Sequence, residues 1–198
     1  SKRGVLLSWI ERKGPQAILK FAERTAAGWT EARVVASGSD WFVNWADVPS
    51  VLRLENGTLA AHWLQKSGPD TYAYDVRLAR STDQGVTFPP LGLLHEDRSP
   101  VEHGFVSAVP ERAGVRFYYL DGRATANGGP MQLRTVFVEG ERIGPSELVD
   151  ESVCDCCSTA SAGLASGSAV AYRDRTADEI RALVEEGVLG VGAAPLPT

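Results

Sequence analysis

The densest group of reactive side chains in the sequence is a run of three thiols within four residues, Cys154-Asp155-Cys156-Cys157. Thiolates bind soft metal ions such as Zn²⁺ and Cu⁺, and His103 could add an imidazole ligand. The spacing is not that of a zinc finger, and two alternatives stay open. Cys156 and Cys157 could form a vicinal disulfide, or the three cysteines could be small buried residues that open a strand.

Arginine and aspartate occur together in two further segments, Leu120-Asp121-Gly122-Arg123 and Tyr172-Arg173-Asp174-Arg175. A guanidinium group can bind a carboxylate through two parallel hydrogen bonds, which suits clustered arginines to an acidic ligand. The same residues could instead form ion pairs that tie neighbouring parts of the fold together. The two segments therefore predict either a binding site for an acidic ligand or a set of structural ion pairs.

The composition is that of one ordinary folded domain. The chain has 198 residues, of which 43% are hydrophobic and 23% are charged. A formal charge of −5 argues against non-specific binding to nucleic acid, which requires a basic face. No apolar run approaches the ~18 residues of a membrane-spanning helix. We therefore expect a single domain over residues 1–198, with no nucleic-acid partner and no membrane span.

The elements that must position the reactive residues recur along the chain. Four short apolar segments end in Trp9, Trp63, Tyr119 and Tyr172, which are 54, 56 and 53 residues apart. Further short runs, separated by turns that carry Gly or Pro, bring each unit to about four strands. Four strands at this period are typical of β-propeller blades, because one small sheet cannot bury both of its faces alone.

The repeat predicts an all-β fold with about four four-stranded blades, either a small closed propeller or part of a six-bladed one. The blades extend over approximately 1–38, 39–95, 96–150 and 151–198. A β-sandwich of about 15 strands is the alternative, but it gives no reason for a fourfold repeat.

Residues 177–186 carry a helix-capping pattern, yet their place in the repeat favours a strand. The first blade begins at its second strand, so we expect self-association through open blade edges, or closure by a tail strand.

A turn motif occupies residues 81–88, with the sequence Ser81-Thr82-Asp83-Gln84-Gly85-Val86-Thr87-Phe88. Asp83 can accept backbone N–H bonds across a hairpin turn, Gly85 permits a positive φ, and Phe88 can pack between sheets. The motif resembles the Asp-box, the repeat of bacterial neuraminidases and other sialidase-like propellers. In that superfamily Asp-boxes lie on the outer rim. The resemblance therefore implies a structural role for five residues: Ser81, Asp83, Gly85, Thr87 and Phe88.

The topology of a propeller blade brings distant segments to one face, because the innermost strand starts where the second strand ends. Some candidate residues directly precede the expected innermost strands: Asp47, Glu102, His103, Cys154, Cys156 and Cys157. Others directly follow the second strands: Arg12, Asp121, Arg123, Arg173 and Arg175. We therefore expect both sets to surround the central axis of one face, where ligands commonly bind.

The sialidase resemblance implies roles for these residues. Sialidases bind the substrate carboxylate with arginines and use a Tyr nucleophile, its carboxylate partner and an Asp acid/base. Four arginines could bind the carboxylate: Arg12, Arg123, Arg173 and Arg175. Asp47 or Asp121 could be the acid/base, and Glu102 the partner of the tyrosine. No nucleophile can be placed, because the candidates look like strand residues: Tyr118, Tyr119 and Tyr172. The Arg-Ile-Pro signature is also absent.

Three aromatic residues complete the expected binding set. Trp41 and Trp45 could stack on a sugar or fill the core, and His103 could contact the substrate. The resemblance as a whole implies a carbohydrate-directed protein with exo-glycosidase (sialidase) activity, although its catalytic set is incomplete. A non-catalytic propeller that binds a ligand or a protein is one alternative, and a metal-binding propeller is another. We expect a glycan or small acidic ligand, an extracytoplasmic location (periplasmic or secreted), and no cofactor other than Zn or Cu at the cysteines.

Overall fold

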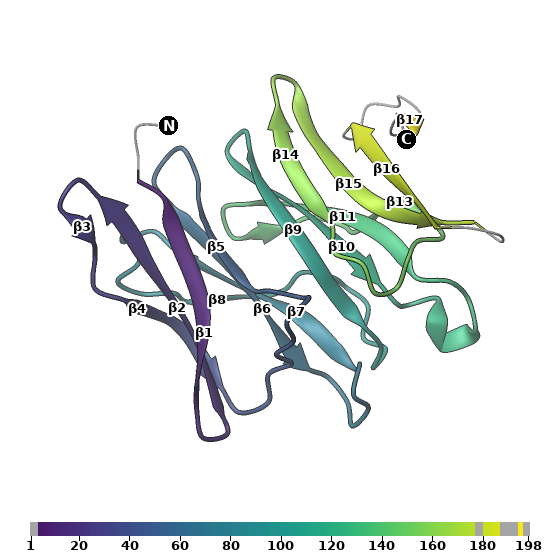
Figure 1. Ribbon diagram of the computed structural model, residues 1–198, viewed down its shortest axis with the longest axis horizontal. Helices are drawn as coiled ribbons and strands as arrows, with labels where there is room; N and C mark the ends of the chain where they lie inside the picture. Colours follow the sequence, from purple (N-terminus) through teal and green to yellow (C-terminus); the bar gives the residue numbers. More distant parts are fainter. Residues whose placement is uncertain (1–3, 177–179, 187–193, 196–198) are drawn as a thin grey trace.

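The computed structural model describes residues 4–176, 180–186 and 194–195, and within these the chain is all-β. Apart from the 3₁₀ helix η1 (Thr125–Asn127), every regular element of the described residues is a strand. The strands form four antiparallel sheets that follow one another in chain order (Figure 1). The prediction of an all-β, propeller-type fold is therefore confirmed. Nothing in the described part of the chain is a helix of the length and hydrophobicity that would cross a bilayer.

Each sheet is built from strands that are consecutive along the chain. The first sheet contains β1 (Leu6–Lys13), β2 (Gln16–Thr25), β3 (Gly28–Trp29) and β4 (Arg33–Gly38). The second contains β5 (Ser50–Arg53), β6 (Leu59–Lys66), β7 (Tyr74–Ser81) and β8 (Pro90–Leu93). The third contains β9 (His103–Glu111), β10 (Gly114–Asp121), β11 (Gln132–Glu139), β12 (Arg142–Ile143) and β13 (Glu147–Asp150). The fourth contains β14 (Ala160–Leu164), β15 (Gly167–Arg175), β16 (Ile180–Glu186) and β17 (Ala194–Pro195).

The innermost strands of successive sheets are neighbours. β9 lies between β5 and β14, and β5 also contacts β1, the edge strand of the first sheet, so the sheets fan out side by side (Figure 1). This is the arrangement of propeller blades, whereas a sandwich would stack two layers. The strand predicted at 177–186 is confirmed for β16, and residues 177–179 lie outside the described residues.

The first sheet has no innermost strand among the described residues. Its strand β1 carries Trp9, which is the counterpart of Trp63 on β6, the second strand of the next sheet. By this match β1 corresponds to a second strand. In the described part of the chain, β1 pairs with β2 and its other edge pairs with no strand. The tail strand β17 pairs with β16, so it extends the fourth sheet and does not close the first.

Apolar side chains fill the spaces between adjacent sheets. The described residues contain three buried clusters, one for each pair of neighbouring sheets. Representative members are Phe21 and Leu59 between the first two sheets, Leu78 and Val115 between the second and third, and Tyr118 and Val170 between the third and fourth. Neighbouring sheets thus bury apolar faces against each other, which makes the stability of one blade depend on the next.

The turn between β7 and β8 has the hydrogen bonds that its sequence predicts. The Asp83 carboxylate accepts hydrogen bonds from the Thr87 backbone N–H at 3.0 Å and from the Thr87 hydroxyl at 2.6 Å. Ser81 Oγ donates to Asp83 Oδ1 at 2.7 Å and accepts from the Gly85 N–H at 2.7 Å. The bonds from Thr87 and Ser81 lower the pKa of Asp83. The hydrogen-bond partners of Asp83 among the described residues lie within this turn or at its start.

The same turn packs against the first sheet. Gly85 has a φ of 87°, and a Cβ at this position would lie 2.4 Å from Phe21 Cζ. Phe88 packs edge-on against Phe21, with ring centroids 5.7 Å apart. Glycine is therefore required at position 85 both by its backbone conformation and by the close approach of the neighbouring sheet.

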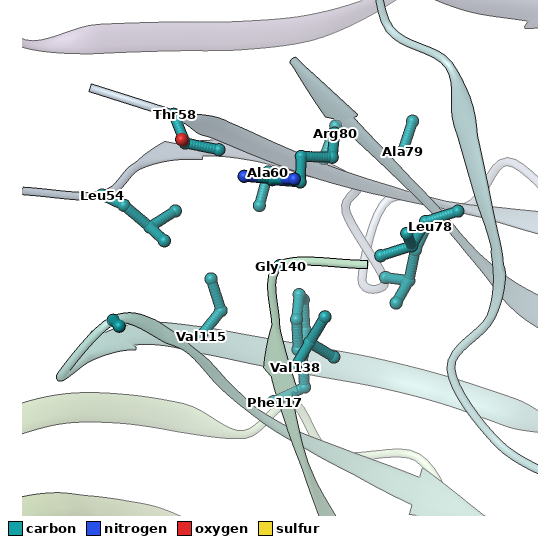
Figure 2. Close-up of a pocket in the computed structure, with 13 residues that line it drawn as sticks. Leu54, Thr58, Ala60, Leu78, Ala79, Arg80, Val115, Phe117, Val138 and Gly140 are labelled. Carbon is teal, nitrogen blue, oxygen red and sulfur yellow. The ribbon is translucent and has the colours of Figure 1, made fainter. Parts of the chain in front are cut away.

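A small apolar cavity lies between the second and third sheets. It has a volume of ≈ 20 Å³, and Figure 2 shows Leu54, Leu78, Val115 and Val138 among the side chains that surround it. A space of this size holds about one water molecule. The cavity is therefore a packing imperfection between two blades, and it is too small for a sugar or any other organic ligand.

Candidate functional site

Three loops that lead into innermost strands meet at one end of the molecule. Ser158 Oγ, before β14, donates a hydrogen bond to the Ala46 carbonyl, before β5, at 3.0 Å. The Phe105 N–H of β9 donates to Asp47 Oδ2 at 2.7 Å, and Thr159 Oγ1 donates to the Phe105 carbonyl at 2.7 Å. These contacts bring the starts of β5, β9 and β14 together. We call this end of the innermost strands the axial face.

Asp47, Tyr74 and Glu102 form a hydrogen-bonded group at the axial face, which we call the acid cluster. Tyr74 Oη donates to Glu102 Oε1 at 2.6 Å and lies 3.4 Å from Asp47 Oδ2. Strand β7 begins at Tyr74, so the third strand of the second sheet delivers the phenol to the start of β9. Phe42 stacks on the Tyr74 ring with centroids 4.0 Å apart. The acid cluster unites two predicted carboxylates with a tyrosine that the sequence analysis did not identify.

An irregularity in β9 shapes the acid cluster. The pairing of β9 with β10 shifts register between Gly104 and Ser107, which is the mark of a β-bulge. Phe105, inside the bulge, has a φ of 49°, an unusual value for a residue with a side chain. This conformation directs the Phe105 N–H at Asp47, while Gly104 leaves room for that carboxylate: a Cβ there would lie 2.2 Å from Asp47 Oδ2.

Burial sets the protonation of the acid cluster. Removal from water raises the pKa of Asp47 to about 6, although the Phe105 N–H and the Tyr74 hydroxyl favour its charged form. Burial also raises the pKa of Glu102, against the hydrogen bond from Tyr74, and the charges of Asp47 and Asp155 raise it further. The pKa of Tyr74 is raised by burial and by both carboxylates, so Tyr74 stays a phenol. At mildly acidic pH the acid cluster therefore holds a proton that it could donate.

Access from solvent differs within this region. Asp47 is 2% exposed and Tyr74 is 0% exposed, whereas Glu102 is only half-buried. Trp45, two residues before Asp47, is 92% exposed. A ligand at the axial face could therefore reach Glu102, whereas Asp47 and Tyr74 could act on it only through Glu102.

The structure corrects the expectation that Trp41 offers a surface for a sugar. Trp41 is 9% exposed and stacks on Trp63, with ring centroids 5.4 Å apart and planes 22° from parallel. Both rings belong to the core between the first and second sheets. Trp41 therefore fills the core, which was the other alternative for this residue.

Two buried imidazoles, His95 and His103, form a second polar group near the acid cluster. Their rings stack at 3.9 Å between centroids with planes 13° apart. His103 Nε2 lies 3.0 Å from Asp97 Oδ2, and His95 Nδ1 lies 3.1 Å from the Asp97 carbonyl. Because both partners are acceptors, these two nitrogens carry the protons. The opposite nitrogens, His103 Nδ1 and His95 Nε2, lie 3.6 and 3.8 Å from Asp75 Oδ1.

The stacking of His95 on His103 argues against a shared metal ion. A metal bonds to an imidazole in the plane of its ring, and two nearly parallel planes cannot both contain one ion. Burial lowers the pKa of His95 to about 4, so this ring is neutral near pH 7. The structure also corrects the expectation that His103 joins the three thiols, because its two nitrogens face Asp75 and Asp97.

The structure assigns Asp121 and Arg123 to an ion pair. Arg123 Nε donates to Asp121 Oδ1 at 2.9 Å and Nη2 to Oδ2 at 2.7 Å, while Nη1 reaches Glu96 at 2.8 Å. Burial would raise the pKa of Asp121, but the hydrogen bonds from Arg123 lower it overall. Asp121 is 0% exposed, so it could not reach a substrate as acid/base. The expected catalytic roles of these two residues are therefore corrected to a structural one.

The other predicted arginines lie apart from the acid cluster's hydrogen bonds. Arg175 forms an ion pair with Asp155 at 3.1 Å, and Arg173 Nη1 donates to Cys157 Sγ at 3.7 Å. Arg12 is exposed at the end of β1. Arg173 is also exposed. Arg12 and Arg173 are thus the two of these four arginines that are exposed to solvent.

The three cysteines are free thiols, so the vicinal disulfide considered for Cys156 and Cys157 is not formed. Cys154 is buried, Cys157 is half-buried and Cys156 is exposed. Cys154 Sγ lies 2.7 Å from Cys157 Sγ and 3.6 Å from Cys156 Sγ. Burial opposes ionisation of Cys154, but the hydrogen bond from Cys157 lowers its pKa overall. The hydrogen bond with Cys154 and its negative charge raise the pKa of Cys156 to about 11.

No family model and no curated protein matches this chain. Solved structures do resemble it. The GH93 α-L-arabinofuranosidase of Fusarium graminearum has a TM-score of 0.58, 14% identity and 90% coverage of this chain. A protein of unknown function from Dyadobacter fermentans has a TM-score of 0.54, 15% identity and 86% coverage. The xylan β-1,4-xylosidase of Bacillus halodurans has a TM-score of 0.52, 11% identity and 98% coverage.

These likenesses concern the fold alone, because all three identities are low. The present chain spans 57% of the arabinofuranosidase chain, 46% of the Dyadobacter chain and 44% of the xylosidase chain. It is therefore about half the length of the proteins it resembles. Two of these three are glycosidases by name, and none of the three is named a sialidase.

Proposed function

We propose that this chain is a carbohydrate-directed propeller that hydrolyses a glycosidic bond at its axial face. The observation that carries the proposal is the acid cluster, in which Tyr74 Oη donates to Glu102 at 2.6 Å beside the buried Asp47. Trp45, on the loop that contains Asp47, is an exposed aromatic side chain. A carboxyl group with a raised pKa can protonate a glycosidic linkage, and an exposed indole on the same face could stack on a sugar.

Glu102 is the catalytic acid of the proposal. It is half-buried, and its raised pKa favours the protonated carboxyl, which gives its proton to the glycosidic oxygen as the bond to the anomeric carbon breaks. Tyr74 and Asp47 are positioning residues, since both are buried and act on the substrate through Glu102.

Asp155 is the catalytic base of the proposal. Its charge is close enough to raise the pKa of Glu102, and it forms an ion pair with Arg175. As the aglycone leaves as an alcohol, a water molecule adds to the anomeric carbon and passes its proton to Asp155. Two carboxyl groups held in different environments are the usual basis for dividing the roles of acid and base.

Hydrolysis of fluorogenic glycosides tests the proposal. The panel contains an α-sialoside, an α-L-arabinofuranoside and a β-xyloside, because the Asp-box resemblance and the two glycosidase neighbours suggest these classes. We expect turnover of at least one. Glu102→Gln should lower kcat by about 10²–10⁴-fold, while the exposed control Glu141→Gln stays within about twofold of the wild type. Absence of turnover by folded protein on all three substrates would overturn the enzymatic proposal.

A non-catalytic glycan-binding module is the second candidate. It is favoured by the complete burial of Tyr74 and by the ion pairs that engage Arg123 and Arg175. Calorimetric titration with sialyl-, arabino- and xylo-oligosaccharides distinguishes the two candidates. In the binding module, Trp45→Ala abolishes the heat of binding although the wild type hydrolyses nothing. In the enzyme, the same variant raises KM more than it lowers kcat.

A further inference from the structure

The loop that carries the three thiols is held firmly at both ends. The Val153 N–H donates to the Met131 carbonyl at 2.9 Å, and the Cys154 N–H donates to the Arg173 carbonyl at 2.8 Å. Beyond the thiols, Thr159 Oγ1 donates to β9 at 2.7 Å. The loop is therefore tied to the third sheet and to β15, which fixes the backbone from which the thiols project.

The three sulfur atoms converge on one another. Cys154 Sγ lies 3.6 Å from Cys156 Sγ and 2.7 Å from Cys157 Sγ, and all three sulfurs lie within 4.8 Å of one another. Metal–sulfur bonds of ~2.3 Å would place the donors of a trigonal site about 4 Å apart. The distance between the Cys154 and Cys156 sulfurs already approaches this value. The distance between the Cys154 and Cys157 sulfurs must widen. Cys157 is only half-buried, so its side chain has room to rotate.

We propose that Cys154, Cys156 and Cys157 form a trigonal binding site for a single cuprous ion. Soft thiolates select Cu⁺, which is satisfied by three sulfur ligands, whereas a structural Zn²⁺ site requires four ligands. The nearest candidate for a fourth ligand in sequence, Asp155, is engaged by Arg175 at 3.1 Å. His103 is engaged by Asp97 at 3.0 Å.

The charge of such a site is compensated locally. Three thiolates and one Cu⁺ carry a net charge of −2, and Arg173 already donates to Cys157 Sγ at 3.7 Å. On binding, three S–H bonds break, three sulfur–copper bonds form and three protons pass to solvent. No oxidation or reduction takes place, because the copper is supplied as Cu⁺. The site does not depend on the proposed glycosidase activity, since Glu102 is not one of its ligands.

Anaerobic titration of the fully reduced chain with Cu⁺, against a colorimetric cuprous chelator, tests the proposal. We expect one equivalent of copper per chain, with a thiolate-to-copper absorption band in the ultraviolet. Cys156→Ser is the first variant, because this thiol is exposed and its loss should leave the fold intact. It should weaken Cu⁺ binding by at least about 100-fold, as should Cys157→Ser. His103→Gln is the matched control and should bind Cu⁺ as the wild type does.

Circular dichroism and thermal melting of each variant identify any that fail to fold. The proposal is overturned if reduced wild type with three titratable thiols takes up no Cu⁺. It is also overturned if folded Cys156→Ser and Cys157→Ser bind Cu⁺ as tightly as the wild type, or if Zn²⁺ displaces Cu⁺ at equal concentration. Loss of copper from folded His103→Gln would instead point to a mixed thiol–imidazole site and contradict the trigonal arrangement.

Discussion

Ionisable side chains buried in this molecule make its stability depend on pH, and His62 is the plainest case. Its ring lies on β6, within 3.2 Å of Ser50 Oγ and edge-on to Phe117. Burial lowers the pKa of His62 from 6.5 to about 4, although a hydrogen bond to the Val48 backbone opposes this. The folded protein therefore keeps His62 neutral over a range in which the unfolded chain protonates it.

We expect His62 to destabilise the protein as the pH falls from 6.5 to 4. In this window the unfolded state binds more protons, so the contribution of neutral His62 is fully present above pH 6.5 and is lost on acidification. The loss in free energy of unfolding at pH 4 is about 3 kcal/mol for such a shift. Urea unfolding of the wild type and His62→Asn at several pH values measures it, because the other titrating groups cancel in the difference.

The control is the comparison above pH 7, where His62 is neutral in both states. There the two proteins should differ by a constant amount, set by the lost packing of the ring against Phe117. Below pH 6.5 the difference should shrink, since only the wild type loses stability through this site. Two parallel curves down to pH 4 would contradict the prediction.

Asp47 and Glu102 can be predicted from the sequence as site residues, whereas Tyr74 cannot. The two carboxylates could be proposed because innermost strands start at one face, which depends only on strand order. The same rule places the start of a third strand at that face, and Tyr74 opens β7 there. An aromatic residue at a strand start has no distinctive sequence signal, however. Its role is decided by Asp47 and Glu102 opposite its hydroxyl, which are 27 and 28 residues away.

At the scale of elements, the bulge in β9 converts a regular strand into a binding element for a carboxylate. The repeat in the sequence predicts the strand itself, and β9 lies where the period requires it. The bulge could not be predicted, because its conformation is stabilised by Asp47 from the preceding blade. Trp41 shows the same limit: a tryptophan beside a predicted site fills the core when another ring, Trp63, is there to stack on it.

We expect Gly104→Ala to disrupt this element. The new Cβ would lie 2.2 Å from Asp47 Oδ2 and 2.7 Å from Tyr74 Cε2, so the acid cluster or the bulge must move. Overpacking of this kind costs about 1–3 kcal/mol in the free energy of unfolding. Urea denaturation measures the loss, and Gly163→Ala on β14 is the control, since its Cβ would meet its nearest neighbour, Val109 Cγ2, at an ordinary 3.5 Å. Equal stability of the two variants would contradict the role assigned to Gly104.

At the scale of the whole molecule, the four sheets lie in a row whose first member is incomplete among the described residues. The ends of β5, β9 and β14 opposite the axial face, together with the start of β1, line an open depression of ≈ 670 Å³. The repeat predicted this arrangement because each blade has the same strand order. The sequence could not predict whether the row closes, since closure depends on contacts between its first and last sheets.

The edge of β1 that pairs with no strand in the described part of the chain predicts self-association of the 198-residue chain. This strand is eight residues long, and a long edge with free backbone N–H and C=O groups pairs readily with another strand. Leu7 on β1 is 51% exposed and adjacent Val5 is 68% exposed, so a second copy would also bury apolar surface. Light scattering over a range of concentrations should therefore show a mass above the 21.2 kDa of one chain.

A charge placed on this edge should oppose the association. Leu7→Lys puts an ammonium group where a second strand would dock, so the mass should shift towards that of the monomer at the same concentration. Val86→Lys is the control, because Val86 is 73% exposed but lies in the turn between β7 and β8. Association that persists in Leu7→Lys and weakens in Val86→Lys would place the contact on the outer rim. A monomeric wild type at every concentration would mean that the β1 edge is protected in solution, contrary to this prediction.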